Sequence, residues 1–96
     1  MIKHIVCFKL NDNSNKAKNE AKDILLSMVD NVPEIKEIEV GADFLCSAKS
    51  YDVILQVTLA DRNALELYQN DKYHSEVVKA YMRIHAATSV VVDYEI

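Results

Sequence analysis

The sequence predicts one α+β domain whose strands and helices follow in the order βαββαβ. Four segments alternate apolar and polar residues with the two-residue period of a strand. Two longer segments between them repeat apolar residues at the spacing of an amphipathic helix. The chain has 96 residues with one glycine and one proline, which leaves little room for long irregular loops. We therefore expect residues 1–96 to form a single domain.

The first strand and the first helix are expected in the first third of the chain. Residues 2–10 alternate and are rich in β-branched and aromatic types, and His4 interrupts their apolar face. The polar loop 11–15 supplies residues that cap helices. Apolar residues then recur at helical spacing from Ala17 to Val32, and Pro33 ends the helix. The opposite, charged face of this helix carries Lys16, Lys18, Glu20, Lys22 and Asp23.

The next two strands are expected at residues 38–42 and 51–59, joined by a loop over residues 44–50. The first of these strands is the more polar, because glutamates separate its apolar residues. The second alternates most clearly in the whole chain. One face of it carries Tyr51, Val53, Leu55, Val57 and Leu59.

The second helix is predicted from Arg62 to Asn70, with Asp61 as its N-cap. The helical pattern breaks there and restarts at Lys72. Residues 89–96 form the last predicted strand. In that strand the residues expected to face the helices are Val90, Val92 and Tyr94. Those expected on the other face are Val91 and Asp93.

Two right-handed βαβ crossovers place both helices on one face of a four-stranded antiparallel sheet, which is the ferredoxin-like arrangement. The other face then carries apolar residues (Ile5, Cys7, Ile54 and Val91) beside polar ones. An apolar face left in water is a reason to expect a partner, and the economical partner is a second copy of the chain. We therefore expect a homodimer that forms through the open sheet face.

The composition argues against several classes of partner. The net charge is −4 and no basic stripe is present, so we expect neither a nucleic acid nor a membrane partner. The apolar run at residues 2–8 is too short for a signal peptide or a membrane span, so a cytoplasmic location is expected. Cys7 and Cys46 have no metal-binding or redox spacing, and no glycine-rich loop exists. No metal and no cofactor are expected.

Three residues are candidates for a functional site: His4, Tyr68 and His74. An imidazole on an apolar strand face needs hydrogen-bonding partners, and His4 finds them if it bridges strand and helix through both ring nitrogens. Tyr68 and His74 lie on either side of the break in the second helix. His74 is a candidate general base, with Tyr68 as donor to a developing enolate oxygen. Alternatively, His74 is a structural residue at a helix start and Tyr68 is a core aromatic.

Four segments spread over the chain carry a resemblance to a known family. They are the His-containing opening strand Met1–Lys9, the junction Val32–Lys36 with Gly41 after it, the pair Tyr68 and His74 around the helix break, and the closing strand Val91–Glu95. In this order they resemble the stress-responsive A/B barrel family, whose second-helix motif is Tyr…His-Pro-x-His. Here Asp71, Lys72 and Tyr73 precede the final histidine of that motif.

The resemblance implies an antiparallel barrel built from the sheets of two subunits, with the helices outside. In one branch of the family, typified by olivetolic acid cyclase, an aldol condensation closes a linear polyketide without a cofactor. The residues of that branch that match His4, Tyr68 and His74 line its cavity. The cyclase also uses a tyrosine on its first helix, where this chain has none.

Three functions remain open at this point. The preferred one is a stress-response-type α/β barrel protein that binds a small, fairly apolar ligand in a pocket between sheet and helices. The second is a cofactor-independent lyase or cyclase with His74 as general base and with Tyr68 and His4 orienting the substrate. The third is a structural or regulatory dimer without a cavity. The first two require a void beside the three residues, so a closed core without one there would support the third function and rule out the first two.

Overall fold

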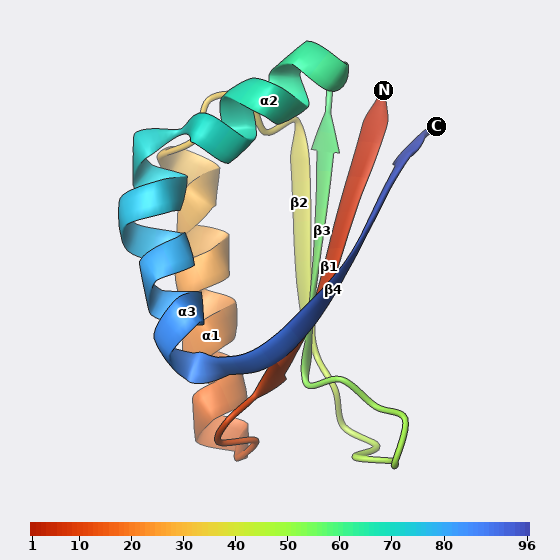
Figure 1. The fold of residues 1–96 in the computed structure, drawn as a ribbon, viewed down its shortest axis with the longest axis vertical. Helices are drawn as coiled ribbons and strands as arrows, with labels where there is room; N and C mark the ends of the chain where they lie inside the picture. Colours follow the sequence, from red (N-terminus) through yellow and green to blue (C-terminus); the bar gives the residue numbers. More distant parts are fainter.

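The elements of the chain follow the predicted order in a computed structural model that describes residues 1–96. The strands form one antiparallel sheet in the order β2-β3-β1-β4. The helices lie along one face of this sheet (Figure 1), which confirms the ferredoxin-like arrangement. The elements are β1 (Ile2–Leu10), α1 (Asn15–Leu26), β2 (Glu37–Ala42), β3 (Val53–Leu59), α2 (Arg62–Asn70), α3 (Ala80–His85) and β4 (Ala86–Glu95).

Two shorter helical turns complete the elements. The first predicted helix divides into α1 and a 3-10 turn, η1 (Ser27–Asp30), before Pro33. The restarted second helix begins as a π-helical segment, η2 (His74–Lys79), and continues into α3. Single π-helical turns inside helices are rare and occur often at functional sites. Asp61 caps α2 as predicted, since its Oδ1 accepts from the Ala64 N–H at 2.8 Å.

The core lies between the sheet and the helices. It is built from alternate residues of β1 and β3 and from the inner sides of α1, η1, α2 and η2. One prediction about this layer is wrong: Lys18, placed on the charged face of the first helix, is buried and only 2% exposed. It lies one turn from Ala21 and two turns from Leu25 on the packed side of α1, so its aliphatic stem is part of the interior.

The predicted faces of the last strand are reversed. Val91 lies opposite Val6, and Asp93 lies opposite His4, so both belong to the helix-covered face. Val90, Val92 and Tyr94 lie on the open face. Three valines in succession give no alternation, so a shift of one residue leaves the hydrophobic pattern unchanged and moves every side chain to the other face. Pairing with β1 decides the register instead.

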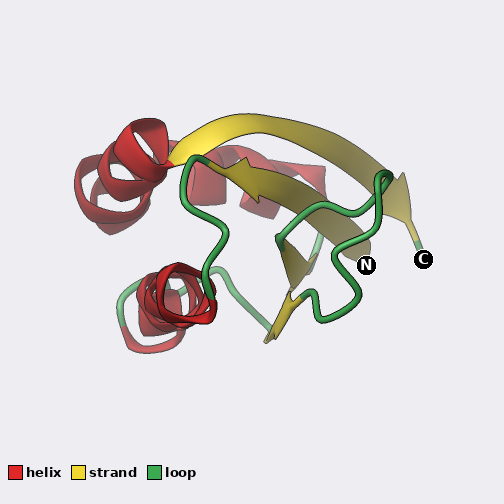
Figure 2. Cartoon of the chain, turned by 90° about the horizontal axis from the view of Figure 1, so that it is seen from below, coloured by secondary structure: helices red, strands yellow, loops and turns green.

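The open face of the sheet is uncovered by any helix of the chain (Figure 2). Its middle carries half-buried apolar residues of β1 and β3, namely Ile5, Cys7 and Ile54. Val90 and Val92 extend this surface along β4, where Val92 is 60% exposed. Tyr51, predicted as the first residue of the strand at residues 51–59, lies before β3 (Val53–Leu59) and contributes to the open face rather than to the core.

No helix is both long and apolar enough to cross a membrane.

Candidate functional site

The fold brings the three predicted residues His4, Tyr68 and His74 into one buried cluster. The Tyr68 ring lies between the two histidines and is 0% exposed. It meets His4 edge to face, with ring centroids 5.4 Å apart, and stacks on His74 at 4.3 Å with the ring planes 5° apart. His4 comes from β1, whereas the other two residues come from the end of α2 and the start of η2. The break in the second helix therefore positions His74 over Tyr68.

A fourth residue, Asp93, completes the cluster and was not predicted. Its Oδ1 lies 2.5 Å from Nδ1 of His4, across the β1–β4 ladder. An ionised carboxylate only accepts hydrogen bonds, so Nδ1 of His4 carries the proton and donates it. This bond replaces the predicted bridge from His4 to a helix. The signal available in the sequence was a lone aspartate within a valine-rich strand, but the assumed register placed it on the wrong face.

His74 is held in one orientation by its own chain. Its Nδ1 donates to the backbone oxygen of Tyr68 at 2.9 Å, and its backbone N–H donates to Oδ1 of Asp71 at 3.0 Å. These bonds fit one of the two alternatives that the sequence allowed for His74, a structural residue at the start of a helix. They also leave Nε2 as the ring nitrogen with a lone pair.

The Nε2 atoms of both histidines retain contact with solvent. Of the four ring nitrogens in these two histidines, only the two Nδ1 atoms make hydrogen bonds. Since no buried side-chain nitrogen or oxygen in the protein lacks a partner, the two unpaired Nε2 atoms are not fully enclosed. Each Nε2 is therefore a ring nitrogen that remains free to accept a hydrogen bond.

Tyr68 is a proton donor rather than a base. Burial, together with the negative charge of Asp93, raises the pKa of its phenol well above the ordinary value. The hydroxyl makes one weak contact inside the protein, to Sδ of Met28 at 3.8 Å. The cluster thus combines two imidazoles that can accept a proton with one hydroxyl that stays protonated at neutral pH.

The histidine at the helix break makes stability depend on pH. Burial, the largest cause, lowers the pKa of His74 below 6.5, and the bond to the Tyr68 carbonyl opposes this only in part. Below the unfolded-state pKa, the unfolded chain takes up a proton that the folded ring resists. The free energy of unfolding is therefore expected to fall as the pH drops from about 7 to about 5, and His74→Gln is expected to reduce this slope.

Urea unfolding at fixed protein concentration across this pH range measures the effect. His85→Gln is the matched control, because His85 is an exposed histidine at the end of α3. Equal slopes in the wild type and in both variants would contradict the prediction.

The cluster itself encloses no cavity. Five hollows are present on the protein, and none of them is lined by His4, Tyr68 or His74. The hollow next to the cluster lies between α2 and the end of the sheet, has a volume of about 250 Å³, and includes Asp93 in its wall. The other lining residues are Ile2, Arg62, Leu65, Tyr94 and Glu95. The void that the first two functions require beside His4, Tyr68 and His74 is therefore absent, which counts against them in that form and supports the structural dimer. The hollow between sheet and helix lies instead beside Asp93, the partner of His4.

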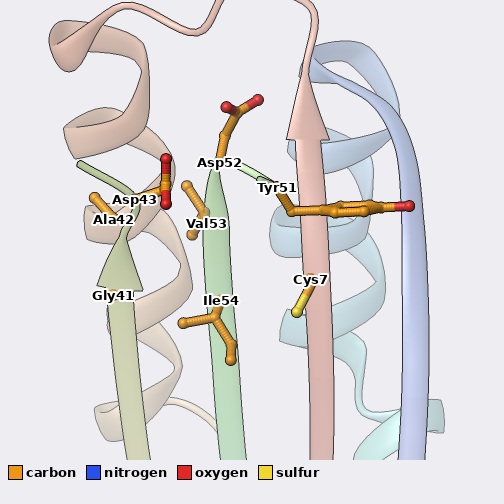
Figure 3. A pocket seen from close by; sticks show the side chains of 8 residues that line it. All are labelled: Cys7, Gly41, Ala42, Asp43, Tyr51, Asp52, Val53 and Ile54. Carbon is orange, nitrogen blue, oxygen red and sulfur yellow. The ribbon is translucent and has the colours of Figure 1, made fainter. Parts of the chain in front are cut away.

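A second hollow of about 240 Å³ lies at one end of the open sheet face. Figure 3 shows the Tyr51 ring extended across β1, near Cys7 and on the same side as Ile54. Lys9 of β1 lies over this ring, with its Nζ 5.3 Å from the centroid. This hollow belongs to the surface through which we expect a second copy to bind, so it is not the preferred ligand site.

No group of three or more histidine, cysteine, aspartate or glutamate side chains is arranged to hold a metal ion.

Comparison with known proteins gives a consistent result over the whole chain. The family model described as "Stress responsive A/B Barrel Domain" matches residues 2–96. Among curated proteins, none matches the chain. Several solved structures share the fold.

A dimeric ferredoxin-like protein of unknown function from Thermobifida fusca has a TM-score of 0.83 and 25% identity, over 99% of this chain and 90% of that one. A dimeric protein of unknown function with a ferredoxin-like fold from Bacteroides fragilis has a TM-score of 0.81 and 21% identity, over 99% and 95%. The hydroxynitrile lyase from Passiflora edulis has a TM-score of 0.82 and 19% identity, over 99% and 92%. At these identities the likeness to the last two proteins concerns the fold alone.

Proposed function

Because the chain belongs to the stress responsive A/B barrel domain family, we propose that it is a homodimeric α/β barrel protein that binds a small, fairly apolar ligand beside the His4–Asp93 pair. The ligand site in this proposal is the α2–β4 hollow, the space lined by Ile2, Leu65, Tyr94, Arg62, Asp93 and Glu95.

One observation carries the proposal: a hollow between sheet and helix is lined by Asp93, whose carboxylate accepts a hydrogen bond from the buried His4 ring. Half of its lining residues are apolar, and the polar ones are charged groups that can fix the orientation of a ligand. Its volume of about 250 Å³ accommodates a molecule of the size of a substituted phenol.

The binding site is tested by titrating the ¹⁵N-labelled protein with 4-ethylphenol, which has an apolar body and one hydroxyl donor. The largest amide shifts are expected at Leu65 and Tyr94. Leu65→Trp fills the hollow and is expected to weaken binding about ten-fold, by loss of roughly 1.4 kcal/mol.

Leu67→Trp is the matched control, since Leu67 is exposed on the same helix and does not line the hollow. Equal weakening by both variants would argue against the site. An absence of saturable binding to the wild type would favour the structural dimer without a ligand.

The dimer is supported by the open sheet face and by the dimeric proteins that share the fold. The half-buried and exposed apolar side chains of β1, β3 and β4 form a continuous surface that two copies can cover by two-fold symmetry. Sedimentation equilibrium is expected to give about twice the monomer mass of 10.9 kDa. Val92→Asp, which places a charge in this surface, is expected to shift the protein toward monomer, and a monomer in the wild type at all concentrations would contradict the proposal.

A second candidate function is cofactor-independent proton transfer, and the His4–Asp93 bond favours it. A carboxylate that holds Nδ1–H leaves Nε2 as the basic nitrogen, which is the arrangement of a general base in many enzymes. This makes His4 the stronger candidate for the base, whereas the sequence favoured His74.

A further inference from the structure

The charges in the wall of the α2–β4 hollow do not cancel. Arg62 is positive, whereas Asp93 and Glu95 are both negative, so the wall has one net negative charge. The apolar side chains of Ile2 and Leu65 line the same space. Removing water from a charge is costly, so a bound ligand of the opposite charge is favoured over one of the same charge. The charge of the wall therefore bears on which class of ligand the hollow accepts.

Arg62, the positive group, is already paired. Its Nε donates to Oε1 of Glu95 at 2.8 Å, and one of its terminal nitrogens donates to the same oxygen. The side chains of Arg62 and Glu95 are 82% and 62% exposed, which places the pair at the rim of the hollow. Since the two charges compensate each other, this arginine is a poor site for the carboxylate of a ligand.

The remaining negative charge is that of Asp93, and one of its two oxygens is free. Oδ1 accepts from Nδ1 of His4, whereas Oδ2 makes no hydrogen bond. The side chain of Asp93 is 34% exposed and no enclosed oxygen in the protein lacks a partner, so Oδ2 is accessible. A neutral imidazole has one N–H to donate, so the bond from His4 orients this carboxylate without cancelling its charge. Asp93 thus offers a fixed, charged acceptor to a molecule in the hollow.

We propose that the α2–β4 hollow selects small primary amines in their ammonium form. The ammonium donates to the free oxygen of Asp93, and the apolar body of the amine packs on Ile2, which is buried, and on Leu65, which is half-buried. A hydrogen bond between two ions is about twice as strong as one between neutral groups. The inference rests on the proposed function, because it names the class of ligand for the same hollow.

Three probes of similar size and different charge test the selection: 2-phenylethylamine, 2-phenylethanol and phenylacetate. Each is titrated into the ¹⁵N-labelled full chain at pH 7, where the first is a cation, the second is neutral and the third is an anion. The amine is expected to bind about ten-fold more tightly than the alcohol, because it adds an ion pair to the same apolar contacts. Phenylacetate is expected to bind more weakly than either.

Asp93→Asn keeps the shape of the side chain and removes its charge, and it is expected to abolish most of the preference for the amine over the alcohol. Asp30→Asn is the matched control, because Asp30 is an exposed aspartate of η1 that does not line the hollow. It changes the net charge of the protein by the same amount and is expected to leave the preference unchanged.

Equal affinities for the amine and the alcohol in the wild type would overturn the selection of amines and leave the ligand site in place. A preference that persists in folded Asp93→Asn would also overturn it. Binding of none of the three probes would contradict the proposed function as well. If Asp93→Asn does not fold, Glu95→Gln takes its place: this exposed variant releases Arg62 and leaves the wall without net charge, so an unchanged preference would overturn the inference.

Discussion

Tyr68→Ala is expected to lower the free energy of unfolding by about 3–5 kcal/mol, the range for deleting a large buried aromatic side chain. The Tyr68 ring is completely enclosed, and it is the surface on which both His4 and His74 pack. Its loss leaves a cavity between β1 and the π-helical turn, and polar rings on both sides make that cavity difficult to close. Chemical unfolding at one protein concentration measures the change, since the stability of a dimer depends on concentration.

Tyr68→Phe keeps the ring and removes only the hydroxyl, so it measures the contribution of the hydroxyl alone. The hydroxyl makes one long contact with the Met28 sulfur, so its removal is expected to cost about 1 kcal/mol or less. A loss in Tyr68→Phe as large as that in Tyr68→Ala would mean that the hydroxyl, rather than the ring, stabilises the core.

Most of the fold could be predicted because its signals are local. The alternation in residues 2–10 and 53–59, the Asp61 cap and the stop at Pro33 each fix one element, and right-handed crossovers then leave few topologies. The faces of β4 and the burial of Lys18 could not be predicted in this way. The first depends on pairing with β1, and the second on a loop that supplies a carbonyl and a thiol to an ammonium from a distant segment.

The candidate site was predicted in its members but not in its chemistry. His4, Tyr68 and His74 do meet, because strand β1 and the break between α2 and η2 bring His4 together with residues 64 and 70 positions further along the chain. Asp93 was missed, and with it the reason to assign different roles to the two histidines. The bond partner of an Nδ1 atom decides which ring nitrogen is basic, and such partners come from tertiary structure that sequence periodicity does not encode.

The second large effect is expected in proton transfer, and it distinguishes the two histidines. The probe is 5-nitrobenzisoxazole: a base removes the proton on its C3 carbon, the N–O bond breaks, and an absorbing cyanophenolate is released. If His4 is the base, His4→Gln is expected to lower the rate about 100-fold, within the usual range for removal of a general base. Asp93→Asn is also expected to lower it strongly, because the asparagine amide can donate to Nδ1 and shift the proton to Nε2.

His74→Gln is the informative comparison, because both Nε2 atoms retain contact with solvent while only His4 donates its Nδ1–H to a carboxylate. Burial lowers the pKa of His74, which makes its ring a weaker base. Replacement of His74 is therefore expected to change the rate several-fold at most. The opposite ranking would make His74 the base, as the sequence suggested. If no protein removes the proton faster than imidazole does in solution, Asp93 only orients His4. The ligand-binding proposal would then stand without an enzymatic one.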